Sequence, residues 1–194
     1  MELLKTKKQI ITIAGRSGSG KSSTAKTVAA RLGFEHFSSG DLFREFAKQH
    51  GESDLNRAAR KPELNSKFDH LVDSKLRQIG QNQDNLVIDS RIAWHWIPQS
   101  FKVFLDLDLS VAAGRILSNV SHHRKTSEHV SSDPAIYHRS LASRDENDAH
   151  RYETQYGINP YDTSNYDLII DTSTNNLEQT TDKIIAGYKK WLEK

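Results

Sequence analysis

The chain has 194 residues, a formal net charge of +2 at pH 7 and no cysteine. That length suits one globular domain with a sizeable core, and so weak a charge gives no argument for a nucleic-acid or membrane partner. Without cysteine the chain can form neither a disulfide nor a thiolate metal site. No apolar run approaches the roughly 20 residues that span a bilayer. The apolar stretch at the N-terminus is too short for a secretory signal. We therefore expect a cytoplasmic protein.

Apolar runs of two different periods alternate along the chain. Short, β-branched runs predict strands at 9–14, 34–37, 85–89, 101–107 and 168–171. Helical spacing predicts helices at 21–32, 42–50, 62–79, 109–119, 135–156 and 177–191, with Gly33 and Gly80 ending two of them. The expected fold class is α/β, with about five parallel strands covered by helices on both faces. Ligands of such sheets bind at the carboxyl ends of the strands.

Segment Gly15–Ser22, GRSGSGKS, matches the phosphate-loop pattern G-x-x-x-x-G-K-[ST] in full. Its glycines let successive backbone N–H groups point at one anion, and the next helix adds its positive end. Lys21 is predicted to reach the β and γ phosphates of ATP, and the Ser22 hydroxyl to ligate Mg²⁺. A flexible glycine turn is the alternative, but the strand before and the helix after favour phosphate binding. The predicted ATP-binding residues are Gly15, Arg16, Ser17, Gly18, Ser19, Gly20, Lys21, Ser22 and Ser23.

Polar residues follow the second and third predicted strands. Ser39 and Arg44 come where a second ligand would face the ATP phosphates, although a helix cap and a solvated arginine are the alternative. Asp89 ends the third strand, where a carboxylate can hold a Mg²⁺-bound water, and Arg91 can reach an acceptor phosphate. A strand-end turn with a surface ion pair is the alternative at this position.

Arg144 and Arg151 are seven residues apart, which is two helical turns, so both face one way. Phosphoryl transfer needs cations over the migrating group more than it needs covalent chemistry. An arginine-bearing lid that closes over the site would supply them and exclude water. An exposed helix face with alternating charges explains the same residues equally well.

With these residues identified, the chain resembles a cytidylate kinase, closest to the archaeal-type branch, from about Gln9 to Thr174. ITIAGRSGSGKSSTAKTVAARLGFEHFSSGDLFRE resembles that family's phosphate loop, first helix and Ser-Gly-x-x-x-Arg turn. RKPELNSKFDHLVDSKL resembles its monophosphate-binding insertion, and NLVIDSRIAWHWIPQSFKVFLDL resembles its third-strand motif. RDENDAHRYETQYGIN and YDLIIDTS resemble its lid arginines and its last strand.

The resemblance implies a P-loop NTPase fold in one domain that phosphorylates CMP or dCMP with ATP and Mg²⁺. Its core would comprise 9–37, 85–119 and 166–194, with a monophosphate-binding insertion at about 38–80 and a lid at about 121–155. The implied catalytic residues are Lys21, Arg91, Arg144 and Arg151. Ser39, Arg44 and Arg91 would bind the monophosphate, Ser22 and Asp89 the metal ion, and Arg115 and Thr172 the adenine of ATP.

The residue that reads the base is not implied by the motif. The bacterial branch of the family has an aspartate after the third-strand arginine, whereas this chain has Ile92, an apolar residue as in the archaeal-type branch. Asp69 on the insertion helix is the candidate, because a carboxylate could accept from the cytosine amino group; a solvated surface acid is the alternative. Trp94 and Trp96 could stack on a base, although core packing is the alternative for at least one of them.

The expected reaction is in-line transfer of a phosphoryl group to a nucleoside monophosphate, without a protein nucleophile. One alternative is another small-acceptor P-loop kinase, acting on UMP, AMP, dephospho-coenzyme A or shikimate. The other alternative is an ATPase or nucleotide switch that resembles adenylate kinase. The expected partners are small-molecule substrates, and the expected assembly is a monomer or a weak dimer.

Overall fold

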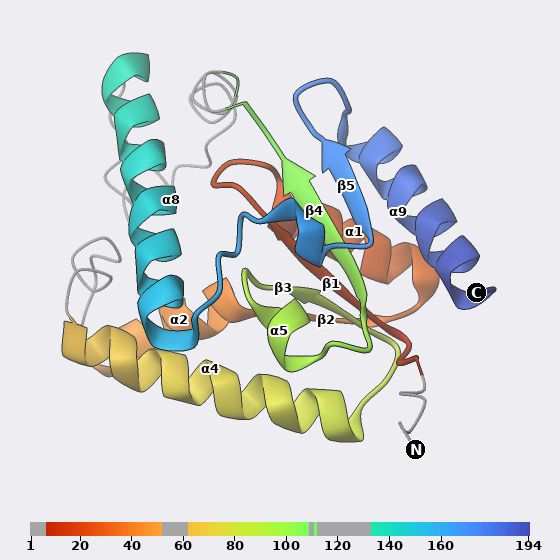
Figure 1. Ribbon diagram of the computed structural model, residues 1–194, viewed down its shortest axis with the longest axis horizontal. Helices are drawn as coiled ribbons and strands as arrows, with labels where there is room; N and C mark the ends of the chain where they lie inside the picture. The colour runs from red at the N-terminus through yellow and green to blue at the C-terminus, as the bar shows by residue number, and fades with distance from the viewer. Residues whose placement is uncertain (1–6, 52–61, 109–110, 112–132) are drawn as a thin grey trace.

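The structure, a computed structural model, describes residues 7–51, 62–108, 111 and 133–194. Within these ranges five strands form one parallel sheet in the order β2-β3-β1-β4-β5 (Figure 1). This confirms the parallel sheet that the alternation of strands and helices predicts. The strands are β1 (Ile10–Gly15), β2 (Glu35–Ser38), β3 (Leu86–Asp89), β4 (Phe101–Asp106) and β5 (Leu168–Asp171).

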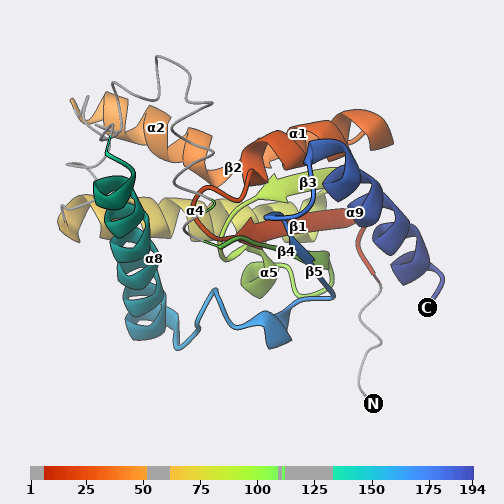
Figure 2. The same cartoon turned by 90° about the horizontal axis from the view of Figure 1, so that it is seen from above.

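Helices cover both faces of the sheet. Two core clusters show this, because one joins the sheet to α1 and α9 and the other joins it to α4 and α5. Figure 2 shows α1 and α5 on opposite sides of the strands. None of the described helices is both long and apolar enough to cross a membrane. The helices are α1 (Lys21–Leu32), α2 (Ser39–Gln49), α4 (Pro62–Asn82), α5 (Ala93–Trp96), α8 (Pro134–Tyr156) and α9 (Leu177–Leu192), with a 3₁₀ turn, η1, at Thr163–Asn165.

The central strand β1 contributes to both clusters, because successive side chains of a strand point to opposite faces. Ile11 and Ile13 pack with α1 and α9, whereas Ile10 packs with α4 and α5, and all three are 0% exposed. Burial on both faces explains why this strand is a continuous apolar run in the sequence.

Gly15 ends β1 at a point where only glycine fits. Its φ of +149° lies outside the range that residues with side chains adopt, and a Cβ there would lie 2.3 Å from the carbonyl oxygen of Leu105 on β4. The chain can therefore turn from the strand into the phosphate loop directly against the neighbouring strand.

Two helix ends differ from the prediction. Helix α4 continues past Gly80 to Asn82, so the prediction that Gly80 ends this helix is wrong. A Cβ on Gly80 would lie 3.1 Å from Ile97 Cγ1, so this glycine lets the end of α5 approach the last turn of α4. Helix α2 begins at Ser39 rather than at Leu42, because the Ser38 hydroxyl caps it by accepting from Asp41 N at 3.2 Å.

Some predicted elements have no described counterpart. The helix expected at 109–119, with Arg115 in it, lies outside the described residues apart from Val111, and so does 121–132 of the expected lid. Conversely, α5 matches no predicted element, because four residues carry too little periodicity to indicate a helix.

Candidate active site

The phosphate loop lies between β1 and α1 at the carboxyl edge of the sheet. Helix α1 begins at Lys21, directly after Gly20 in the left-handed conformation, and no side chain caps its first turn. Backbone N–H groups at such an uncapped helix start are available to an anion. Within the loop Ser17 and Ser19 are buried, whereas Gly18 and Gly20 are exposed and Ser23 lies on the outer side of α1. The structure therefore leaves the first turn of α1 without a side-chain cap at the end of the loop, as a phosphate site requires.

The side chain of Lys21 folds back onto this loop. Its Nζ donates to the carbonyl oxygens of Gly15 and Arg16, both at 2.8 Å. Burial and, after it, the nearby charge of Arg91 lower the pKa of Lys21 to about 7. The charge of Arg144, an exposed residue of α8, acts in the same direction. A phosphate beside Nζ would favour the charged form of the lysine, so this position suits an anion.

Asp89 connects the end of β3 to the phosphate loop and to the start of α2. Ser22 Oγ donates to Asp89 Oδ2 in a short contact, and Ser39 Oγ donates to the Asp89 backbone oxygen at 3.2 Å. Hydroxyl and carboxylate oxygens are ligands that Mg²⁺ prefers, usually one or two of them together with phosphate and water. The described part of the chain contains no group of three or more acidic, histidine or cysteine side chains that could hold a metal ion. Ser22 and Asp89 would therefore suit a Mg²⁺ ion that also takes oxygens from a bound phosphate.

Two arginines from different elements meet at one carboxylate. Arg91, just after β3, has its Nε 3.0 Å from Asp148 Oδ2, an ion pair without the alignment of a hydrogen bond, and its Nη2 donates to Ser17 Oγ at 3.2 Å. Arg151 on α8 places Nη2 3.3 Å from the other Asp148 oxygen. The structure therefore brings Arg91 and Arg151 together beside the phosphate loop, although they are 60 residues apart in the sequence.

Arg151 also joins α8 to α4 through Asp69. Its Nη1 lies 3.3 Å and 3.4 Å from the two carboxylate oxygens of Asp69, whose side chain is 5% exposed. Burial raises the pKa of Asp69 to about 6, although the charge of Arg151 opposes the shift. The alternative interpretation of Asp69 as a solvated surface acid is therefore wrong.

The remaining acceptor-side candidates lie on α2. Ser39 begins this helix and is tied to β3, as described above. Arg44 pairs with Asp41 on the same helix, and its side chain is 41% exposed. This matches the alternative of a surface arginine, so a role of Arg44 in binding a monophosphate stays a prediction.

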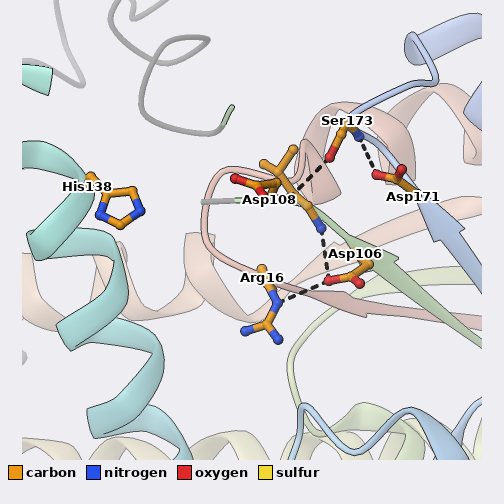
Figure 3. Close-up of a pocket in the computed structure, with 7 residues that line it drawn as sticks. Arg16, Asp106, Asp108, His138, Asp171 and Ser173 are labelled. Atoms are coloured by element: carbon orange, nitrogen blue, oxygen red, sulfur yellow. Dashed lines mark hydrogen bonds and ion pairs between the residues drawn. The ribbon is translucent and has the colours of Figure 1, made fainter. Parts of the chain in front are cut away.

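A cavity of about 570 Å³ opens on the other side of the loop, between the ends of β4 and β5 and helix α8. Figure 3 shows Arg16 and Asp106 on one side of it and His138 of α8 on the other. Arg16 Nε lies 3.0 Å from Asp106 Oδ1. Arg16, Asp106, Leu107, Asp108, His138, Asp171 and Ser173 line the cavity.

Thr172 lies behind this cavity, not in its lining. Its backbone N–H and its hydroxyl both donate to the carbonyl oxygen of Asp106, at 2.8 Å and 2.9 Å, and it is 3% exposed. Thr172 thus ties the turn after β5 to the end of β4, while its neighbour Ser173 lines the cavity. An ATP-binding role for Thr172 stays a prediction.

Sequence reasoning missed three site residues. Asp145 and Asp148 lie in the segment whose alternating charges fit an exposed helix face as well as they fit a lid. In the structure their side chains are only 6% and 16% exposed. The signal was their spacing, because residues 145, 148 and 151 are each three apart and so are neighbours on a helix. Tyr161, whose hydroxyl donates to Asp145 Oδ1 at 3.0 Å, lies in a stretch without periodicity.

The two tryptophans have different surroundings. Trp94 is 7% exposed, packs against Tyr166 with ring centroids 5.6 Å apart, and donates from Nε1 to the Arg91 carbonyl oxygen at 3.0 Å. It is a core residue that supports the turn carrying Arg91. Trp96 is only partly buried, and the guanidinium of Arg77 stacks over its ring at 4.0 Å.

A complete phosphate loop at the carboxyl edge of a five-stranded parallel sheet, with arginines from the turn after β3 and from α8 beside it, defines a P-loop kinase. The chain belongs to the cytidylate kinase-like family, whose model matches residues 10–174. It is thus a phosphotransferase of the nucleoside monophosphate kinase class, acting on small-molecule substrates.

Individual relatives agree with this assignment. The chain is 35% identical to a cytidylate kinase of Haloquadratum walsbyi, over 84% of this chain and 81% of that protein. It is 36% identical to a cytidylate kinase of Natronomonas pharaonis over the same shares. It is also 33% identical to an S-adenosylmethionine-dependent nucleotide dehydratase of Lacinutrix mariniflava, over 96% of this chain but only 37% of that protein. A shikimate kinase from Bacteroides thetaiotaomicron shares the fold, with a TM-score of 0.63, 14% identity and coverage of 95% of this chain and 98% of that one.

Proposed function

We propose that this protein transfers the terminal phosphate of ATP to CMP or dCMP, with Mg²⁺. The observation that carries the proposal is the meeting of Arg91 and Arg151 at the Asp148 carboxylate, beside the phosphate loop. Two guanidinium groups that share one anion are suited to the oxygens of an acceptor phosphate or a migrating phosphoryl group. The similarity to cytidylate kinases over most of the chain supports a cytidine nucleotide as the acceptor.

The described residues have distinct tasks in this proposal. The loop amides and Lys21 bind the ATP phosphates, while the cavity beside Arg16 takes the nucleoside end of ATP. Arg91 binds the acceptor phosphate, and Arg144 and Arg151 stabilise the phosphoryl group in transfer. Ser22 and Asp89 would hold Mg²⁺, which supplies positive charge against the phosphate oxygens. In this proposal α2 and α4 belong to the acceptor-binding insertion and α8 belongs to the lid.

The chain's own contribution is to position and to neutralise the reactants. A monophosphate oxygen is already ionised at neutral pH, so no protein group has to remove a proton before it attacks. Cations that are held in place before the reaction stabilise the charge of the transition state without a reorganisation cost. A cytoplasmic location stays a prediction.

A panel of acceptors tests the proposal. With ATP and Mg²⁺, we expect fast ADP formation and a product of CDP or dCDP mass with CMP or dCMP. UMP, AMP, dephospho-coenzyme A and shikimate should be phosphorylated at least about tenfold less efficiently, the factor that 1.4 kcal/mol of lost transition-state binding gives. Slow ADP release that no acceptor accelerates would identify an ATPase or a switch and would reject the proposal.

We propose further that Asp69 reads the base by accepting from the cytosine amino group. Because its pKa is about 6, the carboxylate is mostly ionised at pH 7.5 and acts as an acceptor. Asp69→Asn should lower kcat/KM for CMP by about 10–100-fold, since a buried hydrogen bond to a charged group is worth about 1.5–3 kcal/mol.

The ratio of kcat/KM for CMP to that for UMP decides this prediction, because the loss of the Arg151 contact lowers both rates alike. Asp73→Asn is the matched control. Asp73 lies one turn further along α4 and accepts from Tyr156 OH at 2.7 Å. We expect this control to leave the CMP/UMP ratio unchanged. An unchanged ratio in Asp69→Asn itself would remove Asp69 as the base reader.

A further inference from the structure

Asp145 on α8 holds a carboxylate directly against the phosphate loop. The backbone N–H of Ser17 points at both of its oxygens, at 3.2 Å and 3.4 Å. The hydroxyl of Tyr161 donates to Oδ1 at 3.0 Å, and Arg16 Nη1 lies 4.0 Å from Oδ2. These contacts come from separate segments and leave the Asp145 side chain 6% exposed. The carboxylate is thus fixed in place, unlike that of a surface acid.

The amide from which Asp145 accepts belongs to the loop that the sequence pattern assigns to the phosphates of ATP. A backbone N–H has one hydrogen, so the Ser17 amide cannot serve Asp145 and a phosphate oxygen equally well. The two anions would also repel each other at this distance, and burial weakens the screening of that repulsion by water. Lys21 meanwhile donates to loop carbonyls. The described arrangement is therefore a loop whose amide is taken by a negative group of the protein.

We propose that Asp145 is an autoinhibitory group that occupies the phosphate loop until ATP displaces it. The inference rests on the proposed function, in that a triphosphate is the ligand of the loop. Part of the binding free energy of ATP is spent on removing the carboxylate, so the wild-type affinity is lower than the loop alone would give. Arg144 directly precedes Asp145 on α8 and is predicted to stabilise the migrating phosphoryl group. The displacement of Asp145 by ATP would therefore also move Arg144. After transfer, the return of Asp145 to Ser17 favours release of the product nucleotide.

The substitution Asp145→Asn tests this directly, because asparagine keeps the shape and an acceptor oxygen but loses the charge. In calorimetry with Mg²⁺-ATP and no acceptor, we expect the dissociation constant to fall about tenfold, which corresponds to 1.4 kcal/mol. Inorganic tripolyphosphate, which has no base or sugar, should also bind more tightly, since the effect acts at the loop.

Glu146→Gln is the matched control, since Glu146 is the next residue on α8, carries the same charge and is exposed. Its dissociation constant should stay within about twofold of the wild type, because exposed charges interact weakly. If Asp145→Asn binds Mg²⁺-ATP no better than the wild type, or worse, the proposal is overturned, and Asp145 anchors α8 instead.

Tyr161→Phe gives an independent measurement in case Asp145→Asn does not fold. It removes the hydroxyl that holds Asp145 in place and should tighten ATP binding about two- to fivefold, since one such hydrogen bond is worth about 0.5–1.5 kcal/mol. No gain here would also contradict the proposal. A wild-type protein that binds no Mg²⁺-ATP would reject the proposed function itself. Normal wild-type binding without a gain in the variants rejects only the role of Asp145.

Discussion

Lys21→Met is expected to lower turnover about a thousandfold, because one preorganised group that stabilises transition-state charge commonly contributes 10²–10³ or more. Lys21 is the cation of the phosphate loop, partly buried and held by two loop carbonyls at 2.8 Å. The measurement is kcat with saturating ATP and CMP. Lys26→Met is the control, since Lys26 lies on the same helix with an exposed side chain and should retain wild-type turnover. A Lys21→Met enzyme within tenfold of the wild type would contradict the assignment.

The same variant makes a prediction about stability and pH. Burial, followed by the charge of Arg91, lowers the pKa of Lys21 to about 7 in the folded protein, against a usual value of 10.5. Between these two values the unfolded chain binds a proton at this lysine that the folded chain does not, so Lys21 makes stability rise with pH. The free energy of unfolding of Lys21→Met minus that of the wild type should therefore be largest at pH 7 and smallest near pH 10, because only the wild type gains stability as the pH rises. A difference that is constant over this range would show that burial does not lower the pKa of Lys21.

Arg151→Ala is expected to reduce kcat by at least about a hundredfold, in line with the large contributions of arginines that contact a migrating phosphoryl group. The reason is its position at the Asp148 carboxylate together with Arg91. Arg31→Ala is the control, because Arg31 also makes ion pairs, with Glu178 and Asp182, but lies in the last turn of α1, at the end away from the phosphate loop. Wild-type turnover in Arg151→Ala would remove α8 from the catalytic arrangement.

From the sequence alone, Arg151→Ala should hardly affect the fold, but the structure changes that expectation. The substitution leaves the Asp69 carboxylate, 5% exposed, without its guanidinium partner. An unpaired buried polar group costs about 1–3 kcal/mol, so the melting temperature should fall as well. Arg151→Lys keeps a positive charge and should recover most of the stability, yet little of the turnover, since a lysine lacks the planar fork. Assays well below the melting temperature separate the two effects.

The phosphate loop and the sheet could be predicted from the sequence because their determinants are local. Gly15, Lys21 and Ser22 lie within eight consecutive residues, and the strand before and the helix after them follow from apolar patterns of one segment each. The alternation of strands and helices then restricts the sheet to a parallel one, with the loop at its carboxyl edge. Asp89 and Arg91 could be placed at that edge because they directly follow a strand.

Only the tertiary structure decided which charges meet across the site. Asp145 contacts a loop amide 128 residues earlier in the chain, and Asp69 pairs with an arginine 82 residues later. In the sequence each of these acids belongs to an amphipathic helix with many charges, and periodicity does not say which charged face another helix will cover. An acid on such a face is solvated unless packing removes the water and supplies a donor. The pairing of α4 with α8, and of α8 with the phosphate loop, therefore turned unremarkable helix acids into parts of the site.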